Sequence, residues 1–266
     1  MQQDGMCLVD HGELHVRRAG SGPALLLVAG GLGGASSYRA LSARLADEYT
    51  VLTYDRRAHF ASTDRTTGPL TVATQADDAR AVIEHFGFDQ ALVFGTSAGA
   101  LIGLDLAARH PGVVTGLIAH EPPAVTLLPD ADEWLDFADY QVERAASGDV
   151  FGAFTGFVQS LAGAGLPDLR AVRLPNQREW EVLFAREIRE FYGYEPDLPA
   201  LRKSGVEITP AAGEGSRGYY HYRPARALAV ELGMPFVEVP GAHLAPQRNA
   251  PRFAETLKSL LAELTP

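Results

Sequence analysis

Cysteine and long apolar runs are scarce in this chain of 266 residues, and each scarcity excludes a class of protein. The single cysteine, Cys7, rules out an internal disulfide and a cysteine-ligated zinc cluster. No apolar run approaches the roughly 20 residues that a membrane-spanning helix needs. The N-terminus, M-Q-Q-D-G-M-C-L-V-D, has neither the basic nor the apolar region of a secretory signal. We therefore expect a cytoplasmic protein without a membrane partner.

Positively charged residues are also fewer than negatively charged ones. The chain has 23 Lys and Arg residues against 33 Asp and Glu residues, which gives a formal net charge of −10. Phosphate backbones are bound by clustered Lys and Arg, so this composition argues against a nucleic-acid partner. The sequence has no internal repeats, low-complexity tails or charge runs, which disfavours a scaffold protein. Length and hydrophobic content fit one large α/β domain, with or without an inserted subdomain.

Two patterns that would indicate a cofactor or a metal are incomplete. The loop A-G-G-L-G-G-A-S-S follows an apolar run, but Ser36 stands where the last glycine of G-x-G-x-x-G would be, counting from Gly31. No P-loop lysine follows it. His11 and His15 are four residues apart, but the alternating pattern around them is typical of a strand, and no third ligand is apparent. We therefore expect no cofactor and no metal.

The most informative stretch is 91–103, A-L-V-F-G-T-S-A-G-A-L-I-G. Its apolar start predicts a buried strand, and an Ala- and Leu-rich helical pattern follows. Gly95, Ser97 and Gly99 lie between them with the spacing G-x-S-x-G. The flanking glycines allow a sharp turn that places the serine hydroxyl in an unusual backbone conformation facing solvent. The sequence thus predicts a strand, a tight turn and a helix, with a serine at the apex.

Strands and helices are predicted to alternate over most of the chain. Strands are expected at 11–20, 24–29, 50–54, 91–94, 113–120, 206–213 and 235–239. Helices are expected at 38–49, 71–86, 219–232 and 251–264, besides the one after Gly99. Such alternation predicts an α/β fold with a mostly parallel central sheet flanked by helices. Active residues should then lie at the carboxyl ends of the strands.

In this order of elements, the chain resembles the α/β-hydrolase family, in which G-x-S-x-G forms the nucleophile elbow. The resemblance implies a core made of residues 1–121 and 201–266, with an inserted helical cap at 122–200. That inserted segment has helical periodicity and many aromatic residues. Most of the aromatic side chains should pack inside the cap, and the rest should line an apolar substrate pocket.

The resemblance also assigns roles to individual residues. Ser97 would be the nucleophile, and His243, in the loop P-G-A-H-L-A-P after the last strand, would be its base. The backbone amides of Gly31 and Ala98 would form the oxyanion hole. The chain departs from the family at Ala29, which stands where a histidine is usual.

A second departure lies in Y-D-R-R-A-H-F-A-S, which is similar to the family loop Y-D-x-R-G-x-G-x-S. Ala58 and Phe60 replace its glycines. Asp55 and Arg57 are interpreted as structural groups that hold the loop by charge-assisted hydrogen bonds. His59 could face the site, or it could be an ordinary hydrogen-bonded loop histidine.

The acid of the triad has two candidates. The family commonly reads G-x-x-D after the penultimate strand, but this chain has G-E-G-S from Gly213, so Ser216 occupies the position of the acid and Glu214 lies two residues earlier. Glu121, at the end of the strand after the elbow helix, resembles the arrangement of certain dehalogenases. We place Glu121 first and Glu214 second.

A serine at the elbow argues against the dehalogenase and epoxide-hydrolase reactions of this fold, which use aspartate there. The resemblance implies a carboxylic ester hydrolase that acts on an ester, lactone or related acyl bond of a small apolar or aromatic metabolite through an acyl-enzyme. Carbon–carbon bond hydrolysis and perhydrolysis use the same constellation. The alternative is a non-hydrolytic member of the fold, either a cyclase- or lyase-like enzyme or a ligand-binding receptor. The oligomeric state is left open.

Overall fold

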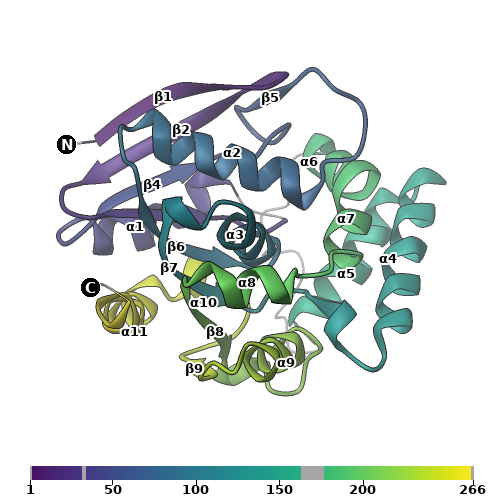
Figure 1. Cartoon of the computed structure of the whole chain (residues 1–266). Coiled ribbons are helices and arrows are strands. Elements are labelled where there is room, and N and C mark those ends of the chain that lie inside the picture. Colours follow the sequence, from purple (N-terminus) through teal and green to yellow (C-terminus); the bar gives the residue numbers. More distant parts are fainter. Residues whose placement is uncertain (1, 32–33, 163–176, 265–266) are drawn as a thin grey trace.

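The computed structural model describes residues 2–31, 34–162 and 177–264, in which strands and helices alternate (Figure 1). The strands are β1 (Gln2–Val9), β2 (Gly12–Gly20), β3 (Ala24–Val28), β4 (Thr50–Tyr54), β5 (Thr63–Asp64), β6 (Ala91–Thr96), β7 (Val114–His120), β8 (Glu207–Gly213) and β9 (Val237–Val239). The α-helices are α1 (Arg39–Leu45), α2 (Val72–His85), α3 (Ala98–Arg109), α4 (Ala131–Ala146), α5 (Val150–Ala162), α6 (Gln177–Val182), α7 (Ile188–Tyr192), α8 (Leu198–Ser204), α9 (Tyr222–Leu232), α10 (Ala245–Arg248) and α11 (Ala250–Glu263). Shorter 3₁₀ turns are η1 (Ala35–Tyr38), η2 (Pro111–Val113), η3 (Val125–Leu127) and η7 (Glu214–Ser216), and η6 (Leu183–Glu187) is a π-helical turn.

Within the described residues, nine strands form one mixed sheet. Its order is β1-β2-β4-β3-β6-β7-β8-β9, and the short β5 pairs with β2. Six strands run parallel to one another, namely β4, β3, β6, β7, β8 and β9, while β1, β2 and β5 form antiparallel pairs. The sequence did not predict β1, because this edge strand is largely exposed and lacks the apolar pattern of a buried strand. The predicted α/β fold with a mostly parallel sheet is confirmed.

The central strands are covered by helices on both faces. In β3, Leu26 and Val28 belong to the core that includes residues of α2 and α3, whereas Leu25 and Leu27 belong to the core that includes residues of α1 and α11. Successive side chains of a strand point to opposite faces, so both sets must be apolar. This is the physical reason why the central strands read as continuous apolar runs.

The regular secondary structure described in the segment 122–200 is all helical, and residues 163–176 lie outside the described part. It contains η3, α4, α5, α6, η6, α7 and the start of α8, and Figure 1 shows α4, α5 and α7 together on one side of the molecule. The expected boundary after residue 200 falls inside α8. Several aromatic side chains of the segment are buried, namely Phe154, Phe157, Trp180, Phe184, Phe191 and Tyr192. No helix in the described residues is both long and apolar enough to cross a membrane.

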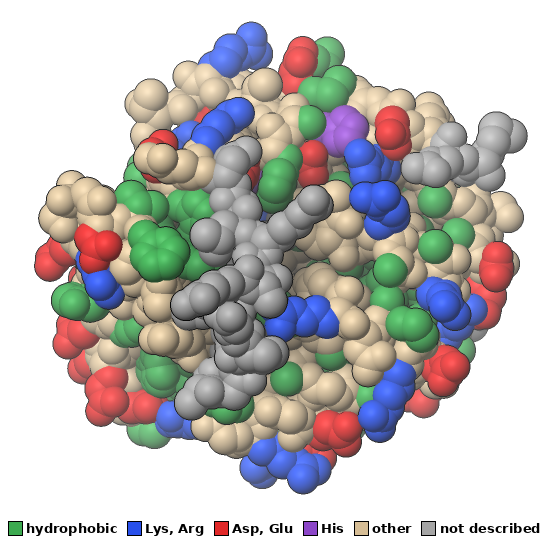
Figure 2. All heavy atoms as spheres, turned by 180° about the vertical axis from the view of Figure 1, so that it is seen from behind, with side chains coloured by type: hydrophobic (Ala, Val, Ile, Leu, Met, Phe, Trp, Pro, Cys, Tyr) green, Lys and Arg blue, Asp and Glu red, His purple; other side chains and the backbone are tan. Residues whose placement is uncertain are grey.

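Charges of both signs are mixed on the surface. On the face of the described chain that Figure 2 shows, Lys and Arg side chains are interspersed with Asp and Glu. Many of the basic groups are paired, for example Arg217 with Glu238, Arg223 with Asp130 and Lys258 with Glu48. Pairing of this kind reduces the positive potential around these basic side chains.

Candidate active site

The predicted turn at Ser97 has the geometry of a nucleophile elbow. Ser97 lies between β6 and α3 with φ 55° and ψ −129°, a conformation that L-residues rarely adopt. A Cβ on Gly95 would lie 2.2 Å from the carbonyl oxygen of Gly99, and one on Gly99 would lie 2.1 Å from that of Val28. Only glycine fits at either position, so the spacing G-x-S-x-G is a direct consequence of backbone crowding.

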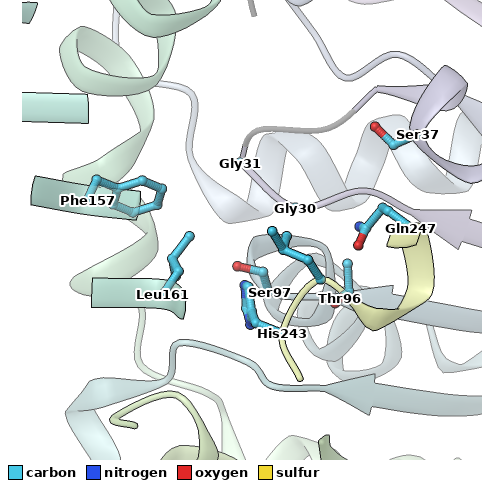
Figure 3. Close-up of a pocket in the computed structure, with 10 residues that line it drawn as sticks. Gly30, Gly31, Ser37, Thr96, Ser97, Phe157, Leu161, His243 and Gln247 are labelled. Carbon is cyan, nitrogen blue, oxygen red and sulfur yellow. The ribbon is translucent and has the colours of Figure 1, made fainter. Parts of the chain in front are cut away.

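A cavity of about 90 Å³ opens beside this serine. Its lining combines the core residues Gly30, Gly31, Ser37, Thr96, Ser97, His243, Leu244 and Gln247 with Phe157 and Leu161 of α5. Figure 3 shows the side chains of Ser97 and His243 next to each other, with Phe157 and Leu161 on the opposite side of the cavity. The sequence-predicted nucleophile and base therefore share one cavity with an apolar wall.

Glu121 is the carboxylate that meets the histidine. Its Oε2 atom lies 2.6 Å from Nδ1 of His243, a short charge-assisted hydrogen bond. Glu121 follows β7 directly, has φ 49° and is completely buried. Its backbone N–H donates to the carbonyl of Ala211 in β8 at 2.8 Å, which fixes the end of the strand against its neighbour. A strained, buried acid in this place is typical of a functional residue.

The surroundings of Glu121 favour its charged form. Burial by itself would raise the pKa of this carboxyl, but the neighbouring imidazoles of His120 and His243 lower it below its usual range. The backbone N–H of Gly213 donates to Oε1 at 2.8 Å, so each carboxylate oxygen has a polar partner. An ionised carboxylate of this kind holds the imidazole in one tautomer, with its other nitrogen free to face Ser97.

Glu214, the second candidate acid, is placed differently. It lies in η7, where its side chain is half exposed and its Oε1 atom is 3.5 Å from Arg252. Ser216, which occupies the usual position of the acid, is buried. Of the two glutamates, the structure brings only Glu121 to His243.

The two expected oxyanion donors, Gly31 and Ala98, both lie beside Ser97. Ala98 is the first residue of α3, and the first N–H groups of a helix have no acceptor within the helix. Gly31 lines the cavity, and its neighbour Gly30 approaches so closely that a Cβ there would be 2.9 Å from Cβ of Ser97. The glycine at position 30 is thus explained by its contact with the elbow.

His221 was not predicted from the sequence. It immediately precedes α9, is fully buried, and its Nε2 atom lies 3.1 Å from Oε2 of Glu121. Burial lowers its pKa to about 3, and His243 contributes to this, so the ring is neutral near pH 7. Nothing in the sequence around residues 217–221 distinguishes this histidine, because its neighbour Glu121 lies far away in the chain.

Glu121, His221 and His243 also form a set that could in principle hold a metal, since their ligand atoms lie within 4.8 Å of one another. The 2.6 Å distance between Glu121 and His243 leaves no room for an ion between those two atoms. We therefore interpret this set as two histidines that share one carboxylate.

The loop after β4 is held by a buried ion pair and a buried hydrogen bond. Arg57 donates from Nε to Asp78 at 2.9 Å, and Asp55 accepts from the backbone N–H of Ala35 at 2.8 Å. Their predicted structural roles agree with these contacts. His59 is not among the described residues that line the cavity beside Ser97. It is buried between Glu179 and Glu187, so it is the hydrogen-bonded loop histidine of the two interpretations above.

Comparison with known proteins places the chain in a family. A family model described as the alpha/beta hydrolase fold matches residues 23–189. The uncharacterized hydrolase YraK of Bacillus subtilis is 34% identical over 97% of this chain and 96% of that protein. A thermophilic esterase from Thermogutta terrifontis has a TM-score of 0.80 at 19% identity, covering 98% of this chain and 99% of that one. An enol-lactonase from Burkholderia xenovorans has a TM-score of 0.77 at 20% identity, covering 97% and 100%. The chain therefore belongs to the α/β-hydrolase fold family.

Proposed function

We propose that this protein is a serine hydrolase that cleaves an ester, lactone or related acyl bond through a triad of Ser97, His243 and Glu121. The observation that carries this proposal is the 2.6 Å hydrogen bond between the buried Glu121 and His243 in the cavity of the strained Ser97. The full-length similarity to a protein named as a hydrolase supports it. The esterase and the enol-lactonase support only the shared fold and not a shared activity, because their sequence identity to this chain is low.

The proposed mechanism follows from these contacts. Oγ of Ser97 attacks the substrate carbonyl while Nε2 of His243 takes the hydroxyl proton, and Glu121 stabilises the resulting imidazolium. The amides of Gly31 and Ala98 donate to the oxyanion of the tetrahedral intermediate. His243 then returns the proton to the leaving alcohol, which leaves an ester on Ser97. Water, deprotonated by the same histidine, releases the acid.

The segment 122–200 acts in this proposal as the cap of the site. Phe157 and Leu161 of α5 face the cavity opposite the triad, so the substrate group that they contact would be apolar. A small ester or lactone with an apolar or aromatic substituent is the substrate class that fits this lining. The chemistry requires no cofactor.

The test is turnover of p-nitrophenyl acetate and butyrate, with fluorophosphonate labelling of the serine. Wild type should label and turn over, whereas Ser97→Ala should do neither and His243→Ala should lose turnover. Folding of each variant is checked by circular dichroism. If folded wild type neither labels nor exceeds Ser97→Ala in rate, the hydrolase proposal is wrong and a non-hydrolytic role of the fold replaces it.

A further inference from the structure

A cluster of four buried charged side chains lies outside the cavity, between the core and the cap. Arg56 and His59 come from the loop after β4, Glu179 from α6 and Glu187 from the end of η6. Their side chains are at most 4% exposed. Isolated buried charges are costly, so such a cluster requires close pairing. Glu187 contacts both Arg56 and His59, and Glu179 contacts His59.

Arg56 connects the cap to the loop that carries Gly31. Its guanidinium forms a forked ion pair with both carboxylate oxygens of Glu187, including a contact of 3.2 Å from Nη2 to Oε2. The same Nη2 atom donates to the backbone carbonyl of Gly31 at 3.3 Å. One side chain is thus bonded to the cap and to the residue assigned as an oxyanion donor.

The turn η6 contacts Gly31 in a second way. A Cβ on Gly31 would lie 3.1 Å from Cδ1 of Leu183, so this side chain packs directly on the glycine. Leu183 begins η6 and Glu187 ends it, so the π-helical turn touches the Gly31 loop at one end and Arg56 at the other. Single π-helical turns occur frequently at functional sites.

The contacts of the His59 ring favour its imidazolium form. Its Nδ1 atom lies 2.7 Å from Oε2 of Glu179, and its Nε2 atom lies 2.8 Å from Oε2 of Glu187. A neutral imidazole has one N–H and could donate to only one of these carboxylates. The charged groups that face the ring are Arg56 from its own loop, Glu179 from α6 and Glu187 from η6. Burial alone would lower the pKa of His59, yet the pKa is raised, with Glu187 and Glu179 as the causes.

The residues that replace glycine in this loop also indicate that the cap holds the loop in place. Ala58 and Phe60 both have positive φ, at 65° and 50°, where the family has glycine. These conformations are strained for residues with a Cβ. The backbone N–H of Phe60 donates to Oε1 of Glu179 at 3.0 Å, so the cap carboxylate helps to hold the strained loop in place.

We propose that Arg56 is a positioning residue that couples the seating of the cap on the core to the orientation of Gly31, and that this coupling requires protonated His59. The role of Gly31 rests on the proposed function. Because the folded state favours the imidazolium, the coupling is complete at pH values below the ordinary His range. It is lost as the pH rises through the raised pKa of the folded state.

The first test measures the coupling without any turnover. The amide resonance of Gly31 and the ring nitrogens of His59 are followed by NMR against pH in wild type, Arg56→Lys and Glu187→Gln. Arg189→Lys is the matched control, because Arg189 also pairs with an acid of the cap, Asp139, but on the surface. We expect an imidazolium at His59 at pH 7 in wild type, and a shifted Gly31 resonance in Arg56→Lys but not in Arg189→Lys.

The second test is kinetic, with p-nitrophenyl acetate. Arg56→Lys should lower kcat about tenfold or more with KM nearly unchanged, since misplacing a donor affects the transition state more than binding. The kcat profile of wild type should fall at alkaline pH. This fall should move to lower pH in Glu187→Gln, which removes one carboxylate from His59, and should be absent in His59→Gln.

The outcomes separate this inference from the proposed function. An unmoved Gly31 resonance in both folded variants, or a neutral His59 below pH 7, overturns the coupling whatever the enzyme hydrolyses. An inactive wild type with both NMR results as expected overturns the hydrolase proposal and leaves the coupling of the cap to Gly31 standing. If Arg56→Lys fails to fold, Glu187→Gln provides the same two readouts.

Discussion

Glu121 and His243 are 122 residues apart in the chain, yet Oε2 of the first lies 2.6 Å from Nδ1 of the second. The contact arises because β7 and β8 are adjacent parallel strands and the loop that carries His243 follows β9, the next strand of the sheet. The carboxyl ends of these strands meet at one edge, where a glutamate can reach the histidine loop. Glu214 is one residue beyond β8, but its side chain is directed to Arg252 at the surface.

Glu121→Gln should lower kcat for p-nitrophenyl acetate by about 10³- to 10⁴-fold, because an amide no longer holds the reactive tautomer of His243 or stabilises its imidazolium. Glu214→Gln is the matched control, and it should stay within about twofold of wild type, as expected for an exposed ion pair. The opposite ranking of the two variants would assign the triad acid to Glu214.

The same carboxylate should make stability depend on pH. Its pKa is lowered in the folded protein, so ionised Glu121 contributes stability at pH values above the ordinary pKa of 4.5. That contribution is lost as the pH falls below 4.5 toward the folded pKa, at about 1.4 kcal/mol per pH unit. Urea unfolding at pH 7, 5, 4 and 3.5 should therefore show a difference between wild type and Glu121→Gln that shrinks below pH 4.5. A difference that is constant over this range would contradict the lowered pKa.

The elbow glycines should tolerate no side chain. Gly95→Ala would place a Cβ 2.2 Å from a backbone carbonyl and should reduce the free energy of unfolding by about 3 kcal/mol or prevent folding. Gly112→Ala serves as the control, because its added Cβ meets nothing within 4 Å and should change stability by less than about 0.5 kcal/mol. Chemical denaturation of both variants measures the difference, and equal effects would mean that crowding does not explain the motif.

The apolar wall of the cavity should limit the size of the acyl group that the enzyme accepts. Leu161→Ala should raise the ratio of kcat/KM for p-nitrophenyl butyrate to that for acetate by about tenfold, since it vacates space opposite Ser97. Phe151→Ala on the same helix is the control, because Phe151 is 67% exposed and should leave the ratio unchanged. An unchanged ratio in Leu161→Ala would place the acyl group elsewhere.

Cys7 should be unreactive in the native protein. Burial, with Asp78 and Glu84 adding to it, raises the pKa of the thiol to about 11, and only the thiolate reacts. Ellman's reagent at pH 8 should therefore detect less than about 0.1 thiol per chain within minutes, and one thiol after denaturation. Rapid labelling of the native protein would show that this part of β1 opens readily.

Local chemistry explains what could be predicted from the sequence. The turn at Ser97 depends on glycines two residues away on either side, and the central strands must be apolar on both faces, so both features are visible in a short window. The same holds for the start of α2, where the side chain of Thr71 accepts from the N–H of Thr74 at 3.1 Å. The exposed strand β1 carries no such signal, and it was missed.

The amino-acid sequence by itself determined the α/β fold, the elbow and the order of serine and histidine along the chain, because each depends on residues close together in sequence. Only the tertiary structure decided which glutamate meets His243, since that choice depends on which strand ends are adjacent in the sheet. It alone revealed His221 beside Glu121, and the buried cluster in which Arg56 meets Glu187 from 131 residues away. Contacts over such distances are products of packing, and a pattern of residue types does not encode them locally.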